Sequence, residues 1–116
     1  MMSVSKIATA LSCTIGYAIA FSGDLTYYQP GLGSCGETNT AEDHIVALAP
    51  AQFEADPKAC GKTIQITIAG GKTATAKVVD KCMGCSDDSI DVSTAVFQEL
   101  ADLTVGRAQI EWDYAT

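Results

Sequence analysis

The sequence predicts a mainly β protein: a small closed barrel of about six strands with one or two short helices, stabilised by disulfides. Three observations lead to this fold class. Short apolar stretches recur with the two-residue alternation of strands, and Gly and Pro residues separate them. Only two stretches suit helices, which is too few for the repeated strand–helix pattern of a parallel α/β sheet. Four cysteines lie in the part of the chain that we expect to fold.

The first twenty residues are predicted to be a secretory signal peptide. This stretch has one positive charge, Lys6, then an apolar run from Ile7, and it ends in the small-x-small pattern Ala18-Ile19-Ala20. The apolar run is too short and too interrupted by Ser and Thr for a membrane-spanning helix. We therefore expect a signal peptide over 1–20, one domain over 21–116, and a secreted protein of the extracellular space or cell wall.

Five strands and two helices can be placed along the expected domain. The hairpin turn is at Gly70-Gly71, and Pro50 suits the first turn of a short helix. The clearest helix is expected over 93–103, where Ser93 can cap the first turn and apolar residues recur at helical spacing. A compact apolar run predicts a strand over residues 44–49, and the other strands are expected over 23–28, 62–69, 72–80 and 107–114.

The cysteines predict two disulfides. Cys13 lies in the predicted signal peptide, and the even number that remains is typical of a short exported chain. A domain of this size buries only roughly 60–65% of its unfolded surface, so cross-links worth roughly 2–4 kcal/mol each matter to it. The sequence alone leaves all three pairings open for Cys35, Cys60, Cys82 and Cys85.

The charge of the chain narrows the class of partner. Seven basic and 14 acidic residues give a formal net charge of −7, and no basic run occurs. The electrostatic footprint of a nucleic-acid-binding protein is therefore missing, and an anionic membrane surface would repel the protein. A neutral polymer or a protein partner stays open.

Several segments in order resemble one known group of proteins. They are "GDLTYYQPGLGSCG", "IVALAPAQF", "CGKTIQI", "VVDKCMGC", "IDVSTAVFQELADL" and "GRAQIEWDY". Together they resemble the double-psi β-barrel proteins, which comprise the rare-lipoprotein-A-like, barwin-like and expansin-like domains. Among these, the chain is similar to small secreted fungal single-domain members such as the loosenins. The resemblance covers the whole expected domain and implies a six-stranded double-psi β-barrel.

The resemblance to expansins implies a polar groove formed by three residues. Thr26 matches the Thr of the first strand, Asp80 in "VVD" matches the first Asp, and Asp91 in "IDVS" matches the essential Asp. The expansin aromatic two residues after the first Asp falls on Cys82, so that contact is missing here. The residues alone leave another interpretation open, in which Asp80 accepts hydrogen bonds from loop amides and Asp91 is a turn residue before a helix.

Three aromatic residues are candidates for binding sugar rings: Tyr27, Tyr28 and Trp112. Alternation along a strand points one of the two adjacent tyrosines into the barrel and the other outward. Trp112 has a second interpretation as a core residue, because a small domain with a single Trp usually buries it.

Hydrolysis is not expected, and no residue is assigned a certain catalytic role. Two acids from separate segments satisfy the general requirement of glycoside hydrolysis. In the similar family 45 glycoside hydrolases, however, the base lies where this chain reads Tyr28-Gln29-Pro30, and an amide cannot take a proton from water. The single histidine, His44, is expected at the surface rather than in a lytic site.

The Cys82-x-x-Cys85 motif is expected to be structural. A redox motif needs a βαβ setting, and the acidic residues that follow disfavour a thiolate. A zinc site needs free thiolates in an oxidising compartment, so no metal or cofactor is expected. The resemblance to expansin and barwin domains favours the pairs Cys35–Cys60 and Cys82–Cys85. Bonds from both loop cysteines back to Cys35 and Cys60 stay open.

Two functions of different class follow. The first is an expansin-like or loosenin-like protein, monomeric, that binds neutral wall polysaccharide, cellulose or chitin, and loosens it without hydrolysis. The alternative is a secreted inhibitor of papain-type proteases or an effector that binds a protein. Disulfide-pinned loops such as 29–37 suit insertion into a cleft. A hydrolase or lytic enzyme is the third and weakest hypothesis.

Overall fold

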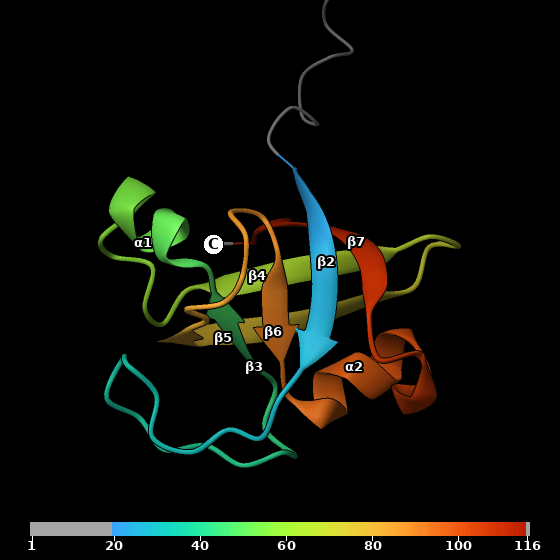
Figure 1. The fold of residues 1–116 in the computed structure, drawn as a ribbon, viewed down its shortest axis with the longest axis horizontal. Coiled ribbons are helices and arrows are strands. Elements are labelled where there is room, and N and C mark those ends of the chain that lie inside the picture. The colour runs from blue at the N-terminus through green and yellow to red at the C-terminus, as the bar shows by residue number, and fades with distance from the viewer. Residues whose placement is uncertain (1–19, 116) are drawn as a thin grey trace, which may run out of the picture.

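A computed structural model describes residues 20–115 and shows a closed six-stranded barrel, which confirms the predicted fold class (Figure 1). The predicted signal peptide lies outside the described residues, apart from its last residue. Around the barrel the strands follow one another in the order β2-β6-β3-β5-β4-β7. Their bounds are Phe21–Tyr27 for β2, Ile45–Leu48 for β3, Thr63–Ile68 for β4, Thr73–Lys81 for β5, Ile90–Val92 for β6 and Ala108–Tyr114 for β7.

The barrel mixes parallel and antiparallel neighbours. β2 is parallel to β6, and β3 is parallel to β5, whereas the other four neighbouring pairs are antiparallel. Strand β6 is the one strand that the sequence did not place, because three residues are too few to show an alternation. It lies between β2 and β3 and completes the closure of the barrel.

Two short helices and a 3-10 turn accompany the strands. Helix α1 runs over Pro50–Ala55 and begins at the predicted proline. Helix α2 runs over Thr94–Leu100, and Ser93 caps it by accepting a hydrogen bond from the Val96 amide. The predicted helix is three residues too long, because Ala101 is already extended and the chain then forms the 3-10 turn η3, Leu103–Val105.

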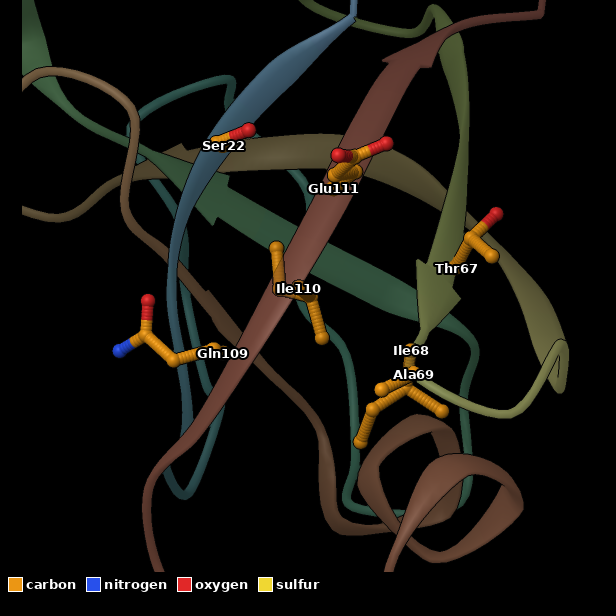
Figure 2. Close-up of a pocket in the computed structure, with 7 residues that line it drawn as sticks. All are labelled: Ser22, Thr67, Ile68, Ala69, Gln109, Ile110 and Glu111. Atoms are coloured by element: carbon orange, nitrogen blue, oxygen red, sulfur yellow. The ribbon is translucent and has the colours of Figure 1, made fainter.

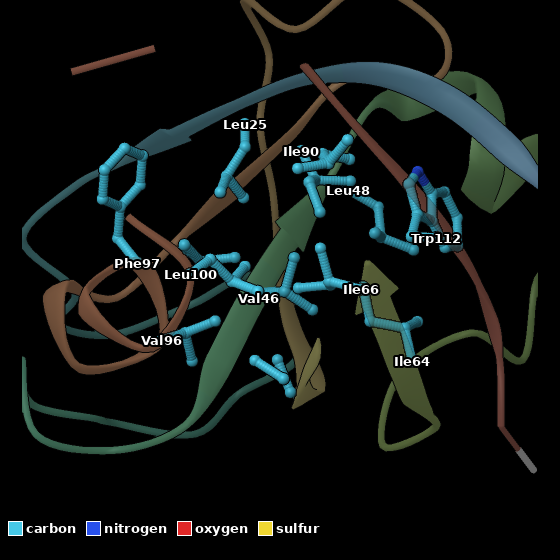
Figure 3. Packing of buried hydrophobic residues seen from close by; sticks show 14 of the residues in the cluster. Leu25, Val46, Leu48, Ile64, Ile66, Ile90, Val96, Phe97, Leu100 and Trp112 are labelled. Atoms are coloured by element: carbon cyan, nitrogen blue, oxygen red, sulfur yellow. The ribbon is translucent and has the colours of Figure 1, made fainter. Parts of the chain in front are cut away.

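Alternate residues of the strands fill the interior of the barrel (Figure 3). Ile64 and Ile66 of β4 and Leu25 of β2 are fully buried. Trp112 of β7 is only 1% exposed; its ring stacks on Phe21 with centroids 4.4 Å apart. The Trp112 indole N–H donates to the Asp88 carbonyl oxygen at 2.9 Å, so its polar atom has a partner inside the protein.

Two disulfides fix the long connections. Cys35–Cys60 joins the connection after β2 to the segment between α1 and β4, and Cys82–Cys85 closes a short loop after β5. These are the two pairs that the resemblance favours. Within residues 20–115, no helix is long and apolar enough to cross a membrane.

We expect Gly33→Ala to destabilise the protein, because the connection after β2 packs tightly on β5 at this residue. A Cβ at Gly33 would lie 2.3 Å from the Val79 carbonyl oxygen. The expected loss in the free energy of unfolding is about 1–3 kcal/mol, the usual cost of overpacking, measured by urea denaturation. Gly31→Ala is the control, since a Cβ there meets nothing within 4 Å. Equal unfolding midpoints for the two variants would contradict this packing.

Candidate functional site

Strand register brings the three predicted groove residues into one row. Thr26 of β2 is the partner of Asp91 in β6, Asp91 is the partner of Ala47 in β3, and Ala47 is the partner of Asp80 in β5. The row therefore crosses four adjacent strands. Ala47, which is buried, lies between the two carboxylate residues of this row. Two strand spacings, roughly 10 Å, separate the backbones that carry the two carboxylates.

Thr26 and Asp91 form a direct pair at one end of this row. The Thr26 hydroxyl donates to Asp91 Oδ1 at 3.0 Å. Partial burial raises the pKa of the Asp91 carboxyl, and the negative charge of Asp80 adds to this rise. The hydrogen bond from Thr26 and the positive charge of Arg107 oppose it. Asp91 is thus a half-buried carboxyl that holds its proton more tightly than an exposed aspartate does.

Asp80 anchors the connection after β2. Its Oδ1 accepts from the Ser34 amide at 2.8 Å, the Ser34 hydroxyl at 3.0 Å and the Lys81 amide at 2.8 Å. This is the amide-accepting role that the sequence left open as the other interpretation of Asp80. Asp80 therefore holds the Ser34 segment beside the groove, and no pattern in the sequence pointed to Ser34.

Tyr28 lies between the two carboxylates. The pKa of its hydroxyl is raised, mainly by burial. The negative charges of Asp80 and Asp91 and a hydrogen bond to Asp80 raise this pKa further. The phenol therefore stays protonated and serves as a donor. Its backbone amide bonds the Val92 carbonyl at 2.9 Å, which fixes it next to β6.

The side chains of Tyr27 and Trp112 point toward the barrel interior, on the face opposite Thr26. The prediction that they bind sugar is therefore wrong for Trp112 and unsupported for Tyr27. Trp112 is buried in the core and presents no ring face to a ligand. The Tyr27 ring lies 4.8 Å from that of Phe97, and its hydroxyl donates to the Leu103 carbonyl. The physical reason is the two-residue alternation, which turns Tyr27 inward together with Leu25.

A hollow of about 330 Å³ adjoins the Thr26–Asp91 pair. The rest of its lining comes from Asp24, Arg107, the Cys82–Cys85 loop, Ser86 and Ser89. Arg107 donates to Asp24 Oδ2 at 2.8 Å, so a charge pair lies beside the Asp91 carboxyl. Neither charged residue was predicted from the sequence to line the site: Asp24 lies two residues before Thr26 on β2, and Arg107 is 83 residues away from Asp24 along the chain. Residues 20–115 contain no group of three or more potential metal ligands.

His44 is exposed, as expected, and its Nε2 lies 2.6 Å from Glu99 Oε2. It lies three residues before Ala47, the β3 residue of the row, and contacts α2 through Glu99.

Comparison with known proteins gives relatives of several kinds. No protein-family model matches the chain. Allergen Asp f 7 of Aspergillus fumigatus is 44% identical over 90 residues, which are 73% of this chain and 33% of that protein. The chain thus spans about a third of that relative. The papain inhibitor of Streptomyces mobaraensis is 30% identical over 119 residues, covering 96% of this chain and 82% of the inhibitor.

Two solved structures share the fold along most of the chain. A mutant expansin of Clavibacter michiganensis in complex with cellohexaose has a TM-score of 0.75 and 25% identity, covering 84% of this chain and 51% of the expansin. The Streptomyces papain inhibitor has a TM-score of 0.74 and 31% identity, covering 85% of this chain and 96% of the inhibitor.

The inhibitor is at least 30% identical and is matched along most of its length, and the expansin shares the six-stranded barrel. The chain therefore belongs to the double-psi β-barrel family of rare-lipoprotein-A-like, barwin-like and expansin-like proteins.

Proposed function

We propose that this protein is secreted and binds neutral cell-wall polysaccharide, cellulose or chitin, in the groove of Thr26, Tyr28, Asp80 and Asp91, and that it loosens the polymer without net bond cleavage. The observation that carries the proposal is the Thr26–Asp91 pair beside an open hollow. Its support from the comparisons is the similarity to an expansin that was solved with cellohexaose.

The groove has the chemistry that sugar hydroxyls need. The Tyr28 hydroxyl donates its proton to Asp80, so its oxygen is left to accept from a sugar hydroxyl, and Asp91 supplies further acceptor oxygens. All of them lie on strands or directly after one, so little order is lost when a chain binds. A polymer hydroxyl that bonds to Asp91 or Tyr28 gives up a hydrogen bond to a neighbouring polymer chain. Loosening is then an exchange of hydrogen bonds.

Two features favour this exchange over hydrolysis. Gln29 stands where the similar hydrolases have a base, and an amide does not accept a proton from water. Asp80 is engaged at Oδ1 by three donors and lies across Ala47 from Asp91.

Asp91→Ala is expected to abolish loosening of cellulose or chitin while the protein stays folded. The loss of a charged acceptor costs binding about ten-fold or more, the scale of a hydrogen bond to an ionised group. The measurement is sedimentation with each polymer, with circular dichroism to check the fold and a reducing-sugar assay of the supernatant. Asp113→Ala, an outward carboxylate of β7 away from the groove, is the control. Undiminished sedimentation of folded Asp91→Ala protein with both polymers would refute the proposal.

Thr26→Val is expected to raise the pKa of Asp91 further, because it removes the hydrogen bond that stabilises the carboxylate. A folded-state pKa above the unfolded value of about 3.9 means that stability falls as pH rises through the folded-state pKa. That fall therefore extends to higher pH in the variant. Carboxyl ¹³C NMR titration measures the pKa of Asp91. Thr75→Val, at an exposed residue of β5, is the control. A lower or unchanged Asp91 pKa would contradict the pairing.

A second candidate function is inhibition of a papain-type protease. Leu32 is 75% exposed and Met83 is 76% exposed. Leu32 lies in the connection pinned by Cys35–Cys60, and Met83 lies inside the Cys82–Cys85 loop. Ser34 ties the first connection to Asp80, and the Cys82–Cys85 loop lines the hollow beside Asp91, so both apolar residues lie on loops next to the groove. Exposed apolar side chains on rigid loops suit anchoring in a partner's cleft.

Under this alternative, the wild-type protein inhibits papain at micromolar concentration or tighter, and the double change Leu32→Ser with Met83→Ser weakens inhibition about ten-fold or more. Steady-state kinetics with a peptide substrate measure the inhibition constant. Val105→Ser is the matched control, since Val105 is an exposed apolar residue of η3 outside both loops. No inhibition by wild type at much higher concentration would retire the alternative.

A further inference from the structure

The polar face of β2 extends well beyond the Thr26–Asp91 pair. Ser22, Asp24 and Thr26 alternate on the outer face of the strand, whereas Leu25 is fully buried. Asp24 accepts from Arg107 and also from the side-chain amide of Gln109. The outer face of β2 therefore carries hydrogen-bonding groups along its whole length.

Three hollows lie along this face, and each shares at least one lining residue with the next. The first, beside Thr26 and Asp91, includes Asp24. The second, of about 470 Å³, includes both Asp24 and Ser22. The third, of about 460 Å³, includes Ser22 and continues over β7 to Glu111 and onto β4 (Figure 2). Each is within the size range of ordinary small-molecule sites, and Asp24 and Ser22 join them into one series.

The loop of residues 86–89 forms a fixed wall beside the second hollow. The Asp24 amide donates to the Ser89 hydroxyl at 3.1 Å, and the Trp112 indole donates to the Asp88 carbonyl. A Cβ at Gly23 would lie 2.4 Å from that same carbonyl oxygen, so the loop lies directly against the strand. The wall is thus part of the rigid barrel.

The far end of the series repeats the chemistry of the near end. Glu111 of β7 is the partner of Ser22 in β2 and of Thr67 in β4. A carboxylate is therefore flanked by hydroxyl groups, as Asp91 is by that of Thr26. Figure 2 shows these side chains around the hollow, with Ile68 and Ala69 at its lower end. Apolar groups beside polar ones match a sugar ring, which has an apolar face and a polar rim.

We propose that the three hollows form one continuous track that holds several consecutive sugar units of an extended neutral polysaccharide, from Asp91 along β2 to Glu111 and Thr67. This inference rests on the proposed function. The five residues from Ser22 to Thr26 span roughly 13 Å of strand, and the terminal hollows lengthen the track at both ends. Its five carboxylates outnumber Arg107 and would repel a polymer of uronic acids; they are Asp24, Asp87, Asp88, Asp91 and Glu111.

Two substitutions that make the same chemical change test the track. Thr67 faces Glu111 across β4 and β7, and Gln65 faces Asp113 in another outward pair of the same strands. Thr67→Arg and Gln65→Arg each add one positive charge opposite a carboxylate, where a cross-strand pair can form. Thr67 lines the third hollow, whereas Gln65 lines none of the three.

The probes are cellotriose, cellohexaose, chitotriose and chitohexaose, titrated calorimetrically into the oxidised protein. Wild type is expected to bind one hexaose roughly five-fold or more tightly than its triose, the scale of one added net hydrogen bond. Thr67→Arg is expected to remove this advantage and leave triose affinity unchanged. Gln65→Arg is expected to behave as wild type.

The outcomes separate the track from the groove. If Thr67→Arg and Gln65→Arg bind hexaose equally, while Asp91→Ala still loses binding, the track is overturned and the proposed function stands. If wild type binds none of the four probes, both are overturned. A hexaose advantage that Thr67→Arg alone removes supports the track.

Discussion

The candidate site depends on one constraint: the register of the three-residue strand β6 between β2 and β3. Ile90 and Val92 are fully buried on either side of Asp91, so alternation leaves Asp91 facing outward. A slip of one residue would turn Asp91 into the core and expose the two apolar residues. The apolar pair therefore fixes the direction of the carboxyl, and the pairing with Thr26 follows from the same register.

So short a strand needs its ends held from outside. At its C-terminal end, the Ser93 amide donates to the Ile45 carbonyl, and the Ser93 hydroxyl donates to the Asp43 carbonyl at 2.5 Å while capping α2. At the other end, the Cys82–Cys85 disulfide constrains the connection that leads from β5 to β6. The Ser89 hydroxyl, just before β6, accepts a hydrogen bond from the Asp24 amide. Ser93 thus ends the strand and begins the helix, which ties the direction of Asp91 to the position of α2.

Most of the fold could be predicted from the sequence, but only part of the site. Strands with five or more alternating residues, and the helix after Ser93, are local patterns, so their existence was predictable and their ends were off by a few residues. The strand β6 has no local pattern of sufficient length. Arg107 and Gln109 reach Asp24 only through the antiparallel pairing of β2 with β7, which joins the two ends of the domain. That pairing is a property of barrel closure, which no short stretch of sequence contains.

The polysaccharide and protease hypotheses use different atoms of the same rigid frame. Sugar hydroxyls would contact the polar row and the outer face of β2, whereas a protein cleft would receive Leu32 and Met83 on the flanking loops. Asp80 serves both, because it holds the Ser34 segment in place and faces Tyr28. A change at Asp80 would therefore disturb both activities and identify neither. Asp91 is a polar groove residue, whereas Leu32 and Met83 are exposed apolar residues of the loops. Changes at Asp91 and changes at this apolar pair therefore distinguish the two hypotheses.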